Sequence, residues 1–560
     1  SAIEQQRQSL SGHSSQASYF GKLHSHHEFY LDLLMQLHRQ SPAAGHAAKA
    51  FEASERARAR TLLEALGETR GDIRQGVDSA LLERETGLRQ QLYFKQQVLT
   101  QLLSGKHTAE QVATAEEELK TLLNQQREVV ALIRANSPRY AALTQSETLS
   151  LKQVQELLGD DTVLLEYALG EERSHLFAVT KTSFDVYELP KRAEVESLAK
   201  QFYDIAARHS PEFVVTEEWL AKAEKRYPAT ADRLSRMILQ PAAAQLGKKR
   251  VMVVAEGILQ YIPFAALPVI GGQLPVAGKN SDSRLLIQDH EIISLPSASV
   301  LAVLRRELKQ RRPAPKSVVV LGDPVFANND PRIAANVITP KPTGLSANSA
   351  ALRQSLRRRI ADLDARKLWI ARLPYSRQEA SAIASLVPAD SKLLALDFEA
   401  NHQLATSSDL SQYRIVHFAT HGWLDAVMPD MSAIVLSLFD KDGKPQNGFL
   451  RLYEIYNLNL PAELVVLSAC ETGLGKDIKG EGLIGLTRGF MYAGARRVLV
   501  SLWQVNDQAT TELMKLFYRG MLKENLAPAA ALKKAQVEMQ RQTRWRSPYY
   551  WAGFVLQGEW

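Results

Sequence analysis

Two reactive side chains each follow a short apolar run in the sequence. His421 comes just after the run at 415–418, and Cys470, the only cysteine among the 560 residues, comes just after the run at 464–467. Continuous apolar runs of this length are typical of parallel strands that helices cover on both faces. Because functional groups of open α/β sheets collect beyond the carboxyl ends of strands, we expect the imidazole and the thiol to face each other.

A cysteine and a histidine in this arrangement are sufficient for nucleophilic catalysis. The imidazole takes the thiol proton or stabilises the thiolate, and later protonates a leaving amine. Gly422 has no side chain to block its backbone N–H, so we expect the N–H groups of Gly422 and Cys470 to form an oxyanion hole, in which one donor is worth about 3 kcal/mol. No acidic third member is evident from the sequence.

The alternative is that both residues are structural. A lone cysteine at a strand end is usually a small buried core residue, and a lone histidine is usually a satisfied structural one. Their occurrence at two strand ends, 49 positions apart, with glycine directly after the histidine, favours the catalytic interpretation.

The elements that must position this pair are predicted from about residue 150 onward, where strands and helices alternate as in an α/β sheet. The predicted strands are 162–167, 176–180, 184–189, 251–254, 318–321, 393–396, 415–418, 433–438, 464–467 and 498–502. A long exposed loop rich in Asn, Ser, Pro and Arg is expected at about 325–368.

Residues 1 to about 140 are predicted to be helical. Ser41-Pro42 is a start signal for a helix that ends near Gly67, and its pairing with the preceding helix resembles tetratricopeptide-type repeats. Two heptad-like helices follow, and the Ser104-Gly105 break between them favours an antiparallel hairpin over pairing with another chain.

Composition limits the alternatives. The formal net charge is +7 and no apolar run approaches the roughly 20 residues that span a bilayer. A single cysteine excludes an internal disulfide or a cysteine metal cluster and fits a reducing compartment, so we expect a cytoplasmic protein without cofactor or metal. The numbering opens at Ser1, and we expect that an upstream portion was trimmed.

Beyond these patterns, the chain resembles the CHAT-domain proteins, bacterial cousins of separase that are often fused to tetratricopeptide repeats. The resemblance covers roughly residues 150–560 as an ordered set of short motifs. They are 419–422 (Ala-Thr-His-Gly), 468–473, 480–483, Leu486, Arg488, Phe490, 493–495, 501–503, Val505, Asp507, 548–552 and Phe554, with Gly257, 263–267, 373–374 and Glu379 earlier in the chain.

The resemblance implies an α/β caspase-like fold after an all-α region. A helical region would occupy 1–145, a pseudo-caspase lobe without a dyad 150–310, and the catalytic lobe 315–560. Both dyad positions, His421 and Cys470, match the family. Gly489 replaces a common alanine, which should leave the chemistry unaffected.

The same resemblance suggests a substrate pocket beside the strand at 498–502. Trp503 is expected to pack against a substrate side chain, and Asp507 to bind Arg or Lys at the base of the first specificity pocket, with Asp425 as a weaker candidate. The alternative for Asp507 is that it caps the helix that follows it.

Together these observations predict a gated cysteine endopeptidase that cuts a protein substrate, in bacterial defence or regulated proteolysis. A regulatory protein is expected on the N-terminal helices, and no membrane partner is expected. The alternative is a non-proteolytic scaffold that keeps the fold for protein binding only. Nucleic-acid binding through the basic stretch at 353–366 is disfavoured because it rests on charge alone, and the same stretch is the expected site if the chain cuts itself.

Overall fold

The structure is a computed structural model. It describes residues 13–68, 78–95 (except 79, 86, 89, 90, 93 and 94), 108–135, 149–208, 217–269, 284–308, 313–333, 370–424, 432–468 and 481–560. The chain divides into two compact units. Unit 1 comprises Ser1–Glu64, Ser146–Arg311 and Val555–Trp560, and unit 2 comprises Ala65–Gln145 and Arg312–Phe554.

Unit 1 is built on a mixed sheet with strand order β3-β2-β1-β4-β5-β14. β2 lies antiparallel to both β1 and β3, whereas β1, β4, β5 and β14 are parallel neighbours. The strands are β1 (Thr162–Ala168), β2 (Ser174–Val179), β3 (Phe184–Leu189), β4 (Arg250–Val254), β5 (Ile292–Ser294) and β14 (Phe554–Gly558). The four predicted strands of this unit are confirmed, whereas β5 and β14 were not predicted.

Helices cover both faces of this sheet. On one face, α3 (His46–Glu68), α7 (Leu151–Leu158) and α12 (Ala298–Leu308) pack with side chains from β1, β2 and β4 in one apolar core. On the other, α8 (Arg192–Ala206) contacts α9 (Glu217–Ile238), and the Tyr167 hydroxyl of β1 donates to the Ile238 carbonyl at 2.9 Å.

The start predicted for the second N-terminal helix is wrong by four residues. Ser41-Pro42 begins only a short 3-10 turn, η1 (Pro42–Ala44), without a side-chain cap, and α3 begins at His46. Gly45 lies between the two in the left-handed region (φ 75°), which ends the turn and lets the chain change direction. The preceding helix is α2 (His13–Gln40).

The helical hairpin is partly described. α5 (Ala109–Ala135) packs Val129 and Ile133 with Leu88, and Lys95 pairs with Glu118 at 2.6 Å. Later residues of one segment thus meet earlier residues of the other, so the two segments run antiparallel, as predicted. The expected turn at 104–105 and the basic stretch at 353–366 lie outside the described residues.

Unit 2 carries a parallel sheet with strand order β13-β12-β8-β6-β7. Its strands are β6 (Lys316–Gly322), β7 (Lys392–Leu396), β8 (Tyr413–Ala419), β12 (Leu464–Leu467) and β13 (Arg497–Ser501), close to the predicted bounds. The strand predicted at 433–438 is shorter. It is β10 (Ala433–Val435), which joins a separate small sheet with β9 (Gly422–Trp423) and β11 (Phe449–Arg451).

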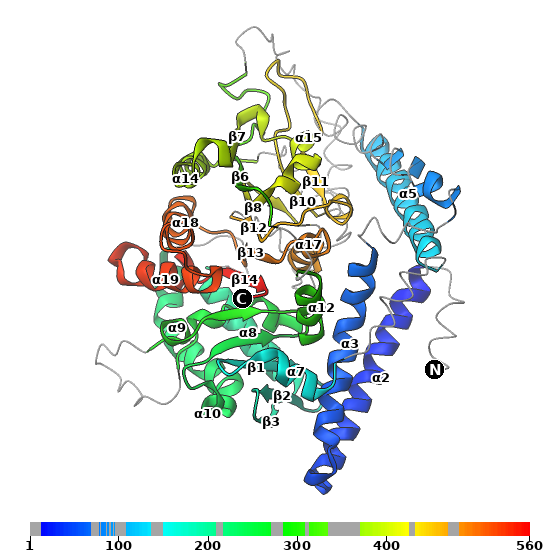
Figure 1. Ribbon diagram of the computed structural model, residues 1–560, viewed down its shortest axis with the longest axis vertical. Coiled ribbons are helices and arrows are strands. Elements are labelled where there is room, and N and C mark those ends of the chain that lie inside the picture. Colours follow the sequence, from blue (N-terminus) through cyan, green and yellow to red (C-terminus); the bar gives the residue numbers. More distant parts are fainter. Residues whose placement is uncertain are drawn as a thin grey trace. The chain divides into compact units, whose positions relative to one another are not determined.

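β8 is covered on both faces, which explains its mostly apolar sequence from Ile415 onward. Its His417 contacts side chains of α14 (Pro374–Ser385) and α18 (Asp507–Leu522), whereas the neighbouring Phe418 packs against Phe490 of α17 (Glu481–Tyr492). In Figure 1, α14 and α18 accordingly lie on one side of the strands and α17 on the other. The C-terminal end of β8 therefore emerges from a rigid layer.

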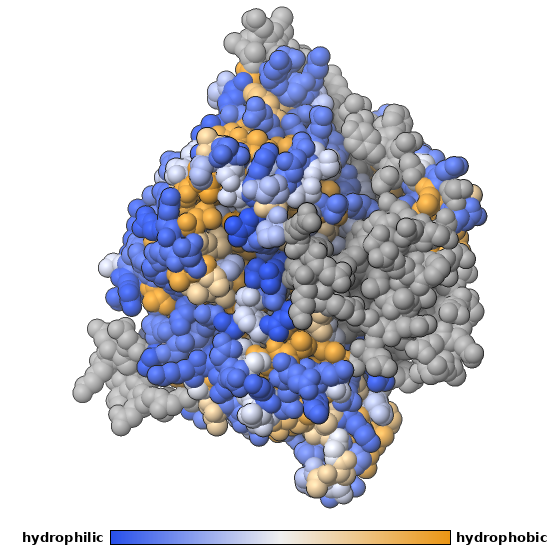
Figure 2. All heavy atoms as spheres, in the orientation of Figure 1, coloured by the Kyte–Doolittle hydropathy of each residue, from blue (hydrophilic) through white to orange (hydrophobic). Residues whose placement is uncertain are grey.

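The surface of the described residues is mainly polar on the face that Figure 2 shows, with small apolar patches between charged regions. None of the described helices has the length and apolarity required to cross a membrane. A search of the same residues finds no cluster of three or more His, Cys, Asp or Glu side chains suited to a metal ion.

Candidate active site

The strand register shows that β8 and β12, the strands that precede the predicted dyad residues in the sequence, are paired neighbours. Leu467 of β12 pairs with Phe418 of β8, and the pairing continues one residue further, because the Ser468 N–H donates to the Phe418 carbonyl at 3.1 Å. His421 follows Phe418 by three positions. Cys470 follows Leu467 by the same three positions in the sequence and lies outside the described residues, as does Asp425.

The His421 ring is buried and held by a backbone carbonyl. Its Nε2 lies 2.7 Å from the Ala371 oxygen. Because a carbonyl can only accept, Nε2 must carry the proton, which leaves Nδ1 of the neutral ring with its lone pair. The edge of the ring packs against Phe326, with ring centroids 5.3 Å apart. This carbonyl could not be predicted from the sequence, since Ala371 is 50 positions away from His421.

Backbone bonds to β10 hold the residues around His421 in place. The Val435 N–H donates to the His421 carbonyl at 2.8 Å, and the Thr420 hydroxyl donates to the Val435 carbonyl at 2.5 Å. Gly422, the predicted oxyanion donor, lies on β9 opposite Ile434. The turn after β8 is therefore held by hydrogen bonds to β10 as well as by the bond between the imidazole and the Ala371 carbonyl.

Below this turn, a buried polar triplet fastens β8 to two helices. His417 lies 2.7 Å from a Glu379 carboxylate oxygen on α14 and 2.9 Å from the Tyr518 hydroxyl on α18. All three side chains are buried. Burial, with a smaller effect of the Glu379 charge, raises the pKa of Tyr518 well above its usual value. Glu379 thus contacts the strand that precedes His421.

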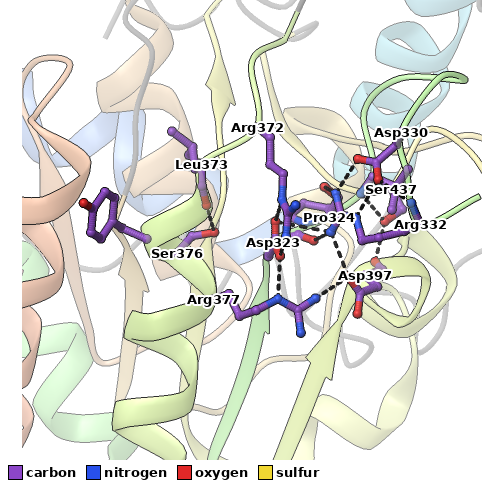
Figure 3. Close-up of polar contacts among 12 residues, drawn as sticks. Asp323, Pro324, Asp330, Arg332, Arg372, Leu373, Ser376, Arg377, Asp397 and Ser437 are labelled. Atoms are coloured by element: carbon purple, nitrogen blue, oxygen red, sulfur yellow. Dashed lines mark hydrogen bonds and ion pairs between the residues drawn. The ribbon is translucent and has the colours of Figure 1, made fainter.

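A second network, which was not predicted, lies at the carboxyl ends of β6 and β7 (Figure 3). Asp323 directly follows β6 and Asp397 directly follows β7, and both adopt left-handed backbone angles (φ 47° and 54°). Arg377 of α14 joins the two carboxylates, donating from Nε to Asp323 at 2.7 Å and from Nη2 to Asp397. Non-glycine residues in this region are strained and cluster at functional sites.

Arg332 completes the network. It donates to Asp397 at 2.8 Å, to both carboxylate oxygens of Asp330 at 2.8 and 2.7 Å, and to the Asp323 carbonyl at 2.7 Å. The hydrogen bond from Arg332 holds the pKa of Asp330 below its usual value. The pKa of Asp397 is also lowered: burial alone would raise it, but hydrogen bonds from Arg377 and Arg332 outweigh that effect.

Asp507 is the first residue of α18, and the helix cap is its neighbour. Asn506 occupies the N-cap position and accepts from the Ala509 N–H at 3.0 Å, so the alternative that Asp507 is the cap is wrong. The Asp507 carboxylate accepts from the Tyr375 N–H at 3.0 Å. Burial raises the pKa of Asp507 to about 6, with smaller contributions from the charges of Glu379 and Asp323, against the lowering effect of the Tyr375 bond.

Trp503, the predicted substrate contact, is buried in the structure. Its indole N–H donates to the Tyr549 carbonyl at 3.0 Å, and its ring lies directly against Gly553. As placed, the ring packs inside the unit, and contact with a substrate would require it to move.

Comparison with known proteins defines the class. The family described as CHAT domain matches residues 228–559, more than half of the chain. The chain therefore belongs to the CHAT-domain family.

Two curated relatives are both called tetratricopeptide repeat protein 28, from Homo sapiens (27% identical over 350 residues) and Mus musculus (25% identical over 356 residues). Each match covers 57% of this chain and 12% of the relative, so the chain spans only a small part of their length.

Among solved structures, the chain is similar to two crystal structures of the Saccharomyces cerevisiae separase–securin complex, each at 10% identity. In the 3.0 Å structure the TM-score is 0.43, with 97% of this chain and 43% of that chain covered. In the 2.6 Å structure the TM-score is 0.37, with coverages of 91% and 40%.

Proposed function

We propose that this chain is a cysteine endopeptidase of caspase-like design in which Cys470 is the nucleophile and His421 the acid–base. The observation that carries the proposal is the register of β8 and β12. Phe418 and Leu467 are paired on adjacent parallel strands, and the histidine and the cysteine each follow three positions later. Adjacent strands lie about 4.8 Å apart, so two chains leaving them in register begin within reach of each other.

The proposed reaction uses the protonation state that the Ala371 carbonyl imposes. His421 Nδ1 takes the Cys470 proton, and the thiolate attacks the substrate carbonyl carbon. The oxyanion is stabilised by the N–H groups of Gly422 and Cys470. The imidazolium protonates the amine as the C–N bond breaks, and water then cleaves the thioester with His421 as base.

A preference for Arg or Lys at the cleaved position is the proposed role of Asp507, with Asp425 as the weaker candidate and Trp503 as a neighbouring contact. The raised pKa of about 6 supports a test of this role. If the ionised carboxylate binds the substrate cation, the preference for Arg over a neutral side chain is present above pH 6 and declines as the pH falls below it.

The alternative is a scaffold without proteolysis. The names of the curated relatives, as tetratricopeptide repeat proteins, agree with a binding role. A regulatory protein on the N-terminal helices remains a prediction under either function. Among the described residues of these helices, the exposed large apolar side chains include Phe29, Leu33 and Leu37 on α2 and Leu132 on α5.

The proposal is tested by incubating wild type, Cys470→Ala and His421→Ala with a protein library and with fluorogenic peptides that differ at the cleaved residue. We expect cleavage by wild type and a loss of about 1,000-fold or more in both variants, because removal of either dyad member abolishes thiolate attack. A covalent peptidyl probe should label wild type, label His421→Ala more slowly and leave Cys470→Ala unlabelled. Cleavage that persists in Cys470→Ala would contradict the assignment, and binding of partners without any cleavage or labelling would favour the scaffold.

A further inference from the structure

Residues 370–373 form a short segment before α14, and each of its residues has an anchoring contact. Ile370 packs with Phe326 in an apolar cluster. The Ala371 carbonyl accepts the His421 Nε2–H at 2.7 Å, and the Leu373 carbonyl accepts from the Ser376 hydroxyl at 2.6 Å. The fourth anchor is the side chain of Arg372, the residue directly after the carbonyl that holds the imidazole.

Arg372 is fixed by a two-point contact. Its Nε and Nη2 donate to the two oxygens of the Asp323 carboxylate at 2.8 and 2.7 Å (Figure 3). A paired contact of this kind sets the direction of the guanidinium as well as its position. The hydrogen bond to Asp323 also raises the pKa of Arg372, so the guanidinium stays charged.

Asp323 is itself a rigid support. Its side chain is fully buried, it directly follows β6, and it also accepts from Arg377 of α14 at 2.7 Å. β6 is paired with β8, the strand that ends two residues before His421. The imidazole and the carboxylate thus lie just beyond the ends of neighbouring strands, and Arg372 spans from the carboxylate to the peptide unit that touches the imidazole.

We infer that Asp323 and Arg372 are positioning residues for the proposed dyad: they hold the Ala371 carbonyl against Nε2 of His421. The carbonyl keeps the proton on Nε2, leaves Nδ1 to receive the thiol proton, and stabilises the imidazolium that forms. This inference rests on the proposed function, because it matters only if His421 serves Cys470. It does not require Asp323 or Arg372 to touch a substrate.

The test uses the single cysteine of the chain, because alkylation by iodoacetamide then reports on Cys470 alone without any substrate. The rate follows the thiolate fraction, so its pH profile gives the thiol pKa, which is about 8.5 for a free cysteine and lower beside an imidazolium. We expect Arg372→Ala and Arg372→Gln to move this profile toward that of a free cysteine by about one pH unit, a roughly tenfold slower reaction at pH 6.5.

Two further experiments distinguish a loss of imidazole positioning from a general destabilisation of the fold. Guanidinium ion at millimolar concentration should partly restore the profile of Arg372→Ala by refilling the Asp323 contact. The matched control is Arg414→Ala, which removes the same two-point geometry with Glu463 (2.9 and 2.8 Å) at the opposite end of β8 and should leave the profile unchanged.

The outcomes are distinguishable. If His421→Ala leaves the wild-type profile in place, the dyad itself is absent and the proposed function fails. If His421→Ala shifts the profile but Arg372→Ala and Arg372→Gln, both folded by thermal unfolding, coincide with Arg414→Ala, the positioning role is overturned. Asp323→Asn keeps the shape of the side chain and one acceptor oxygen. Its pH profile of Cys470 alkylation should therefore lie between those of wild type and Arg372→Ala.

Discussion

At the scale of single residues, Asp507 shows how a partly buried carboxylate lowers the stability of the fold that holds it. Its pKa is about 6 in the folded chain, against an ordinary value near 4 for an unfolded one. Between these two values the folded chain binds more protons than the unfolded chain, so stability falls as the pH rises from about 4 to about 6 and is constant above. A charge held at this energetic cost is typical of functional positions.

Asp507→Asn should therefore stabilise the protein at pH 7.5. The amide oxygen can still accept from the Tyr375 N–H, while the buried charge is gone. We expect a gain of about 2 kcal/mol or less, since the carboxylate is partly exposed, and a rise in melting temperature of roughly 2–6 °C. The gain should shrink as the pH falls and vanish near pH 4. A gain of equal size at pH 4 would show that charge burial is not its cause.

At the scale of elements, the segment before β14 is locked to the exit of β13. The Leu502 N–H donates to the Gly553 carbonyl at 2.8 Å, and a methyl group at position 553 would lie 2.9 Å from Cε2 of Trp503. Glycine is thus required by the close approach of a rigid ring. The segment that carries Trp503 and Asp507 is therefore held by the C-terminal part of unit 2.

Gly553→Ala should destabilise the protein by about 1–3 kcal/mol, the usual cost of overpacking a buried site. The double variant Gly553→Ala/Trp503→Phe should lose less than the sum of the two single variants, because the smaller ring lacks the atoms that clash. Denaturant unfolding of the four proteins in a double-mutant cycle measures this coupling. Strictly additive losses would mean that the ring moves aside.

The predictability of these elements depends on their length and pattern. The parallel strands of unit 2 were predicted because short, mostly apolar runs mark a strand buried on both faces. β5, β9 and β11 span only two or three residues, too few for any periodicity to appear. The Asp323 network was missed for a different reason. Its six members, Asp323, Asp330, Arg332, Arg372, Arg377 and Asp397, are spread over 75 residues of the sequence, and only the position of Asp323 and Asp397 directly after apolar strands was visible there.

At the scale of the whole molecule, the two units should respond to acid in opposite ways. His175 of unit 1 is buried on β2, and neither ring nitrogen has a hydrogen-bond partner among the described residues. Burial lowers its pKa to about 4; Asp32 opposes this effect, whereas Arg39 and Arg173 add to it. The unfolded chain binds the extra proton between about pH 6.5 and pH 4, so unit 1 loses stability as the pH falls through that range, whereas Asp507 makes unit 2 gain it.

His175→Leu should leave the stability of unit 1 nearly unchanged at pH 7.5. It should also remove the loss of stability, up to about 3 kcal/mol, that wild type undergoes between pH 6.5 and 4. Hydrogen exchange of the β1 and β2 amides, corrected for the intrinsic effect of pH, measures this stability. The amides of β12 and β13 in unit 2 serve as the internal control and should respond to Asp507→Asn instead. Equal acid sensitivity of β1 in wild type and His175→Leu would rule out the imidazole as the cause.

Arg332 and Arg372 bind the same aspartate, although residues 333–371 separate them in the sequence. The chain therefore leaves the parallel sheet of unit 2 and returns to it at one point, the Asp323 carboxylate. Such a point is where evolution and engineering can exchange one stretch of chain for another of different length while the sheet, the histidine and its carbonyl keep their places. A domain inserted between Arg332 and Arg372 would thus enter and leave the fold at the same carboxylate.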